Sequence, residues 1–279
     1  MVIKHEKKTF TIQPNEDKSE FFLFITVKGY NGEIFIVTAN KGDKVVRIFD
    51  LQGEEQGRFR GGKKIMALHP VETTIADTEV RGIIWADKFG EVRFYNLTQL
   101  GKEKTEEEEK KETTAADQEK EEGGKLLFGH QEIISHLVLN PSKTFILTVD
   151  VARKIKVTHF PNVVDMHSMN FNHTKEITNA FFVSDGVFVT YSKEDSHLSV
   201  FSIEKDNTSL LFEIKPFRDL DSISSIGDFS LSQLSGSRFA AVSSQKVVIM
   251  KVEGSELVTV ETKDRNGEIS TVEEAISDS

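Results

Sequence analysis

The amino-acid sequence predicts an all-β fold built from repeated units, on three observations. Phe is unusually abundant, with 21 residues against one Trp and three Tyr, and together with the β-branched residues it suits a pleated, half-buried surface. Short apolar segments alternate with polar turns that often contain Asp or Gly. These segments recur at a regular interval, as expected for a repeat architecture.

The repeated unit is an apolar strand, a short polar turn, and an alternating strand that ends on an aromatic or comparable residue. Five copies are present, and their end points are separated by 46, 63, 43 and 49 residues. A spacing of about 40–50 residues is typical of the four-stranded blades of a WD-repeat β-propeller. We therefore expect a single β-propeller domain over 1–279. The five end points are Phe49, Tyr95, Thr158, Phe201 and Met250.

The longest interval contains a charged segment, 102–125, with six Lys and ten acidic residues. Without these 24 residues the interval shortens to 39, close to the other spacings. The segment has no apolar face to bury, so we predict a disordered loop inserted between two strands. The alternative is an acidic tether for a basic partner. Residues 263–279 are expected to form a flexible tail.

The third copy contains polar residues that organise a WD repeat. His130, Thr148 and Asp150 stand where a Gly-His pair, a strand hydroxyl and a turn Asp are linked by hydrogen bonds within one blade. The same residue types make a catalytic triad, but at this spacing we favour a structural role. We give the same structural role to Asp87 and His173, in neighbouring copies.

The composition argues against several classes of function. Without Cys there is no thiolate metal site or disulfide, which fits a reducing, intracellular compartment. No apolar run approaches the ~20 residues of a membrane-spanning helix. The net charge of −10 disfavours indiscriminate nucleic-acid binding. We predict no catalytic, cofactor-binding or metal-binding residue, and we find no cluster of the kind that a propeller hydrolase would need.

The most basic short segment runs from Arg58 to Lys64 and includes Gly61 and Gly62. It lacks the spacing of a phosphate-binding loop, so a nucleotide site is not predicted. Contact with RNA backbone or with an acidic partner is weighed against an ordinary solvated loop. The candidate residues are Arg58, Arg60, Lys63 and Lys64.

A second basic segment follows Asp150 and reads Arg153, Lys154, Ile155, Lys156. On a strand, Lys154 and Lys156 point to one face and Ile155 to the other. A solvent-facing strand with no further role is the alternative interpretation.

Two stretches of the chain resemble the WD-repeat non-catalytic subunit of the tRNA guanine-N7 methyltransferase. The first runs from Gly129-His130 through Asp150–Lys156 (DVARKIK) to Phe160-Pro161, and the second is Ala86–Val92 (ADKFGEV). The family typically has Asp-Arg-Asp-Glu-Lys where this chain has DVARK, so an Arg and two acidic residues are missing from the turn. Family members are usually longer and have seven blades.

The resemblance implies a heterodimer with the catalytic methyltransferase subunit, which this chain would bind and stabilise. That partner would hold S-adenosylmethionine and form N7-methylguanosine in the tRNA variable region, and tRNA would be bound through the complex. We expect a nuclear protein, with the cytoplasm as a second location. The alternative is a generic WD-repeat adaptor in another complex, such as a ubiquitin ligase. Carried over by position, the partner-binding residues would be Lys154, Lys156, Arg153 and Lys88.

Overall fold

Every element that the computed structural model describes is a β-strand. In the described part of the chain no helix is long and apolar enough to cross a membrane. The described residues are 2–5, 8–11, 21–40, 44–75, 78–98, 100, 123–163, 166–169, 173–195, 197–204, 207–214, 229–234, 238–243, 246–253, 256–264, 269–270 and 274–275.

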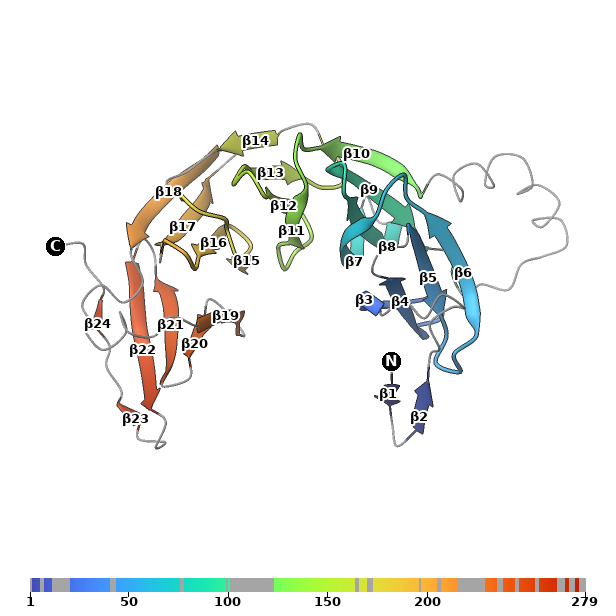
Figure 1. Ribbon diagram of the computed structural model, residues 1–279, viewed down its shortest axis with the longest axis horizontal. Helices are drawn as coiled ribbons and strands as arrows, with labels where there is room; N and C mark the ends of the chain where they lie inside the picture. The colour runs from blue at the N-terminus through green and yellow to red at the C-terminus, as the bar shows by residue number, and fades with distance from the viewer. Residues whose placement is uncertain are drawn as a thin grey trace, which may run out of the picture. The chain divides into compact units, whose positions relative to one another are not determined.

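The chain divides into two compact units, Met1–Leu137 and Val138–Ser279. In unit 1 a hairpin is followed by two four-stranded antiparallel sheets, each in simple sequential order (Figure 1). The hairpin joins β1 (Val2–His5) and β2 (Lys8–Thr11). The first sheet contains β3 (Phe21–Lys28), β4 (Ile34–Asn40), β5 (Val45–Phe49) and β6 (Glu55–Arg60), and the second contains β7 (Ile65–Ile75), β8 (Thr78–Asp87), β9 (Glu91–Asn96) and β10 (Lys125–Gly129).

The same sequential order continues in three further sheets. The last of these carries two very short additional strands, β23 and β24, which both pair with β22. The sheets are β11 (Ile134–Leu139), β12 (Phe145–Asp150), β13 (Ile155–His159) and β14 (Met166–Met169); β15 (Asn179–Ser184), β16 (Val187–Ser192), β17 (His197–Glu204) and β18 (Asn207–Ile214); and β19 (Phe229–Gln233), β20 (Arg238–Ser243), β21 (Lys246–Glu253), β22 (Glu256–Asp264), β23 (Ile269–Ser270) and β24 (Glu274–Ala275).

The predicted fold class, an all-β WD-repeat β-propeller, is confirmed by these repeated sheets. Each of the five predicted repeats supplies the second and third strands of one sheet, as in Val45–Phe49, which is β5. The single domain over 1–279 stays a prediction.

The β15–β18 sheet of unit 2 buries side chains on both faces, and successive side chains along its strands point alternately to the two faces. In unit 2, Phe182, Phe188 and Phe201 pack toward β12 and β13, and the Phe188 and Phe201 rings stack at 4.7 Å. On the other face Phe181 packs toward β20, where its ring centroid lies 5.8 Å from that of Phe239. Phe side chains, which are abundant in the sequence, thus fill the layers between these sheets.

In unit 1, Trp85 on β8 occupies the centre of the layer between the two sheets. Its side chain is fully buried, and its ring lies 5.7 Å from that of Phe59 on β6. Phe59 in turn stacks on Tyr95 of β9 at 4.2 Å. The Trp85 Nε1–H donates to the Gly123 carbonyl at 2.8 Å, so this buried polar atom is satisfied.

The expected insertion, 102–125, ends inside the fold. Gly123 and Gly124 contact the sheet, where the Arg93 guanidinium donates to the Gly124 carbonyl at 3.1 Å, and Lys125 begins β10. Residues 101–122 lie outside the described residues. The expected tail, 263–279, contains the end of β22 and the short strands β23 and β24, and its remaining residues also lie outside the described part.

Candidate functional site

Lys154 and Lys156 follow a tight turn that the Asp150 carboxylate closes. Asp150 Oδ1 accepts a hydrogen bond from the Lys154 N–H at 2.9 Å, and the Asp150 N–H donates to the Lys154 carbonyl at 3.1 Å. The Arg153 N–H also donates to the Asp150 carbonyl, at 2.9 Å. These bonds fix the backbone from which the two Lys side chains extend.

Alternation along β13 places the two cations as the sequence indicated. Ile155 is fully buried, while Lys154 and Lys156 are each partly exposed. Burial lowers the pKa of Lys156, the charge of Lys154 lowers it further, and Asp150 opposes the change. A carboxylate from a partner would relieve this cost, because an opposite charge favours the protonated amine. The pair is therefore suited to binding an anionic group.

Part of the Arg153 side chain makes a contact within the fold. Its backbone has φ 70°, and its Nη1 donates to the Thr174 carbonyl at 2.6 Å. This bond ties the β12–β13 turn to the segment that precedes β15. Arg153 thus supports the position of the turn that precedes Lys154 and Lys156.

His173 sits in a polar network inside unit 2. Its Nε2 lies 2.9 Å from Thr190 Oγ1, and its Nδ1 lies 4.0 Å from Asp195 Oδ1. Asp195 Oδ2 accepts from the N–H groups of Thr174 at 2.8 Å and Lys175 at 3.2 Å. Burial alone raises the pKa of Asp195, but the Ser192 side chain, the N–H groups of Thr174 and Lys175, and His173 bring it below its ordinary value. The geometry supports a structural role for His173.

His130, Thr148 and Asp150 are all buried. The His130 N–H donates to the Gly90 carbonyl at 2.8 Å, which joins β10 to the β8–β9 turn. Buried side chains in this setting support the structural interpretation over a catalytic one, because a catalytic group must reach substrate.

Asp87 organises the β8–β9 turn in unit 1. Its Oδ1 accepts from the Phe89 N–H at 2.9 Å and from the Glu91 N–H at 3.2 Å. The Lys88 N–H donates to the Lys64 carbonyl at 2.8 Å, which joins this turn to the β6–β7 connection. Burial nevertheless raises the pKa of Asp87 above its ordinary value, against the hydrogen bonds from Glu91 and Phe89.

The Asp87→Asn variant tests whether burial raises the pKa of Asp87, through the pH dependence of stability. A carboxyl whose pKa is raised on folding binds protons more readily in the folded state, so its contribution to stability is present at low pH and is lost as pH rises through the folded pKa. Asn can still accept from the two N–H groups and does not ionise. We expect the stability of the Asn variant relative to the unmutated protein to improve from pH 4 to pH 7, measured by thermal unfolding. A relative stability that falls over this range would contradict the assignment.

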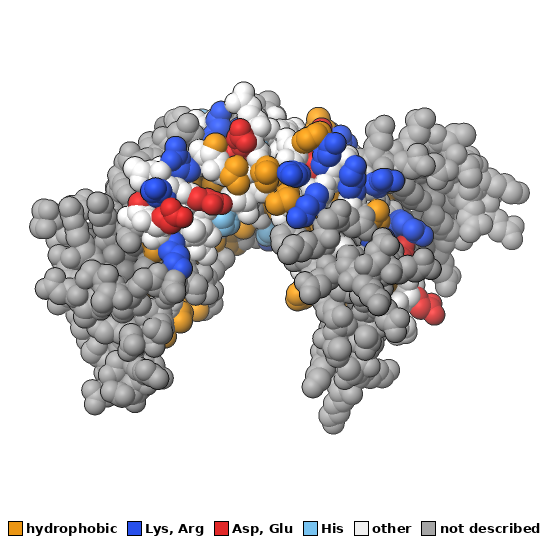
Figure 2. All heavy atoms as spheres, in the orientation of Figure 1, with side chains coloured by type: hydrophobic (Ala, Val, Ile, Leu, Met, Phe, Trp, Pro, Cys, Tyr) orange, Lys and Arg blue, Asp and Glu red, His pale blue; other side chains and the backbone are white. Residues whose placement is uncertain are grey.

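Four of the predicted cationic residues lie on β6 and in the connection that follows it. Arg58 and Arg60 are exposed on β6, not in a loop as weighed from the sequence, and Arg58 pairs with Glu55 at 3.0 Å. Lys63 and Lys64 lie in the connection that follows. Figure 2 shows Lys and Arg side chains gathered over the region of β6, β9 and β10.

A residue that the sequence analysis did not select stands at the tip of the β8–β9 turn. Phe89 is 62% exposed, and Lys63 Nζ lies 4.5 Å from the centre of its ring. Lys88, predicted to bind a partner, is the exposed neighbour of Phe89. An aromatic residue within a polar turn is the signal that could have identified it.

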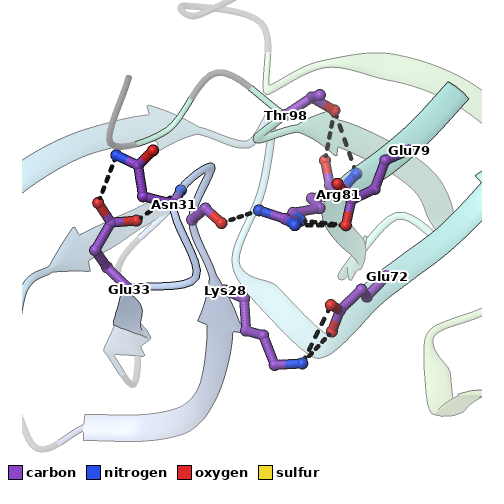
Figure 3. Close-up of polar contacts among 8 residues, drawn as sticks. Lys28, Asn31, Glu33, Glu72, Glu79, Arg81 and Thr98 are labelled. Carbon is purple, nitrogen blue, oxygen red and sulfur yellow. Dashed lines mark hydrogen bonds and ion pairs between the residues drawn. The ribbon is translucent and has the colours of Figure 1, made fainter. Parts of the chain in front are cut away.

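A second polar cluster joins the two sheets of unit 1 at the other end of their strands (Figure 3). Arg81 donates to the Gly29 carbonyl and pairs with Glu79, and its N–H donates to Thr98 Oγ1 at 3.2 Å. Beside it Lys28 pairs with Glu72 at 3.1 Å. The additional bonds, between Asn31 and Glu33, lie within the β3–β4 turn. We interpret the cluster as a structural link between neighbouring sheets.

The described residues contain no group of three or more His, Asp or Glu side chains that could hold a metal ion. The basic residues described above form two surfaces that are candidates for function. One comprises Lys154 and Lys156 in unit 2, and the other comprises Lys63, Lys64, Lys88 and Phe89 in unit 1.

The chain is similar to a curated protein from Dictyostelium discoideum, the tRNA (guanine-N(7)-)-methyltransferase non-catalytic subunit wdr4. The two are 31% identical over 144 residues, which are 52% of this chain and 30% of the relative. The match thus spans less than a third of the relative's length. No protein-family model matches the chain. The resemblance read from the two motifs is confirmed by this similarity.

Proposed function

We propose that this chain is a non-catalytic subunit that binds and stabilises a catalytic tRNA (guanine-N7-)-methyltransferase. The observation that carries the proposal is the 31% identity over 144 residues to a protein named as such a subunit. The repeated sheets support it, because WD-repeat propellers serve widely as rigid binding scaffolds. In this proposal the two chains form a heterodimer.

The chemistry of the complex would reside on the partner. It would bind S-adenosylmethionine and transfer the methyl group to N7 of a guanosine in the tRNA variable region, while this chain would hold it in an active form. tRNA would be bound by the complex, and the complex would act in the nucleus, with the cytoplasm as a second location.

We place the contact with the partner at Lys154 and Lys156. Both extend from a backbone that is fixed by the Asp150 turn, so little backbone conformational entropy is lost on binding. The two positive charges lie close enough to lower the pKa of Lys156. Acidic side chains on the partner would neutralise both, and ion pairs in a partly desolvated contact contribute strongly to specificity.

Charge reversal tests this interface. The double variant Lys154→Glu/Lys156→Glu, co-expressed with the N7-guanine methyltransferase of the same organism, is expected to lose co-purification. Its affinity should fall by about 30-fold or more, since breaking a buried charge pair costs about 2–5 kcal/mol. The matched control is Arg238→Glu/Lys251→Glu, two cationic residues that face each other across β20 and β21 in the same unit. The control should co-purify normally.

Two results would contradict the proposal. Co-purification of the Lys154→Glu/Lys156→Glu variant at the unmutated level would remove these residues from the interface. Failure of the unmutated chain to bind the methyltransferase, with capture of components of another assembly, would favour a generic adaptor. The chain alone, incubated with tRNA and S-adenosylmethionine, is expected to form no N7-methylguanosine.

A further inference from the structure

The β8–β9 turn of unit 1 holds an aromatic ring in solvent on a rigid backbone. Phe89 is 62% exposed, although its N–H is bonded to the Asp87 carboxylate at 2.9 Å. The next residue, Gly90, has φ +80°, and its N–H donates to the Asp87 carbonyl at 3.0 Å. A Cβ at Gly90 would lie 2.7 Å from the His130 carbonyl oxygen, so the turn also packs closely against its neighbour. The ring is therefore presented in a fixed place.

Cationic residues lie beside this ring. Lys63 Nζ lies 4.5 Å from its centre, and Lys88 is exposed beside it. Lys64 is held next to Lys88 by the bond between the Lys88 N–H and the Lys64 carbonyl. These three charges come from two separate connections that the fold brings together.

Two acidic side chains close to the turn are engaged with other groups. Asp87 is fully buried beneath the turn, where it accepts backbone hydrogen bonds. Glu91 pairs with Arg93, with Glu91 Oε2 3.0 Å from Arg93 Nε. The exposed part of the surface therefore combines positive charge with one open aromatic ring.

We propose that Lys63, Lys64, Lys88 and Phe89 form a binding surface for a single-stranded segment of RNA. In this arrangement an unpaired base stacks on Phe89, on the ring face opposite Lys63, while the three lysines neutralise neighbouring phosphates. Stacking on exposed aromatic residues beside a positive groove is how single strands are bound without readout of their sequence. An acidic peptide would use the lysines but would gain little from a rigid, exposed ring.

The choice of RNA over single-stranded DNA rests on the proposed function, whose substrate is a tRNA with unpaired loop nucleotides. The surface itself does not depend on the methyltransferase. The RNA test therefore uses the 279-residue chain alone, and co-purification with the methyltransferase remains a separate measurement. If RNA binding is not observed, the co-purification result can still be interpreted, and the reverse also holds.

The test is the binding of a fluorescent single-stranded RNA of about 12 nucleotides, followed by fluorescence anisotropy at low salt. Phe89→Ala is expected to weaken binding by about 5- to 100-fold, the range measured for loss of one base–aromatic stack. Phe89→Trp keeps an aromatic face and should bind at least as tightly as the unmutated chain. The matched control is Phe24→Ala, because Phe24 is also a Phe of unit 1 and is 61% exposed.

The lysines are tested through salt dependence. Lys63→Gln and Lys88→Gln should each reduce the slope of log affinity against log salt by about 0.7, the value for one phosphate contact on a single strand. A duplex of the same sequence should bind more weakly, because its bases are already stacked. Thermal unfolding of each variant checks that the fold is kept.

Several results would overturn the proposal. These are an unchanged affinity of folded Phe89→Ala and equal weakening by Phe24→Ala. An oligoglutamate peptide that binds tightly and is indifferent to Phe89→Ala would instead identify an acidic-peptide site. Absence of any salt-dependent RNA binding by the unmutated chain would reject it as well.

Discussion

Trp85→Ala is expected to lower the free energy of unfolding by about 3–5 kcal/mol, the range for removing a large aromatic side chain from a core. Trp85 is fully buried between the two sheets of unit 1 and contacts the Phe59 ring. The substitution removes this contact, opens a cavity, and leaves the Gly123 carbonyl without the indole N–H that donates to it at 2.8 Å. Calorimetric unfolding of the full chain measures the loss.

Trp85→Phe is the control that separates volume from hydrogen bonding. It keeps most of the apolar contact with Phe59 but removes the donor to Gly123, so its loss should be clearly smaller than that of Trp85→Ala. A loss below about 1 kcal/mol for Trp85→Ala would mean that the layer can collapse around the cavity, against the packing described for unit 1.

Asp195→Ala is expected to lower the free energy of unfolding by about 2–3 kcal/mol, because hydrogen bonds to a charged acceptor are among the strong ones. The carboxylate accepts from the N–H groups of Thr174 and Lys175, and it faces the His173 ring. Without it, the segment before β15 loses its anchor to the β16–β17 turn. Hydrogen exchange at Thr174 and Lys175 should accelerate.

Asp195→Asn provides the matched comparison. The amide oxygen can replace the acceptor for the two N–H groups but carries no charge opposite His173. We expect an intermediate loss of stability and slower exchange at Thr174 and Lys175 than in Asp195→Ala. Equal exchange rates in the two variants and the unmutated chain would show that this carboxylate does not hold the segment.

The inner strands were predictable because they are short, mostly apolar runs between polar turns. Val45–Phe49 and Phe145–Asp150 are β5 and β12 as the sequence indicated, since both faces of such strands are buried and require apolar residues. The outer strand β6 was not predicted. Its residues Glu55–Arg60 are mostly exposed, with only Phe59 buried, so the sequence carries little periodic signal there.

The sequence alone predicted the basic residues of the two candidate surfaces, but it did not predict that Phe89 belongs to one of them. Lys154 and Lys156 could be placed on one face of a strand because alternation depends on neighbouring residues alone. The pairing of Lys63 with Phe89 depends on a contact between two connections of the sheet, 26 positions apart in the chain. Asp195 could not be identified as the partner of His173 either, because β15 and β16 separate the two residues in the sequence and bring them together only in the fold.

The segment 101–122 is bordered by two anchored ends. On one side the Leu100 carbonyl accepts from the Tyr30 N–H at 2.7 Å, and on the other the Gly123 carbonyl accepts from Trp85. Each end is thus held by its own contacts with the sheets. Because the entropic cost of closing a loop grows only with the logarithm of its length, residues can be gained or lost here at little cost to the fold. The length and charge of the chain can therefore change between β9 and β10 while these two strands keep their pairing within one sheet.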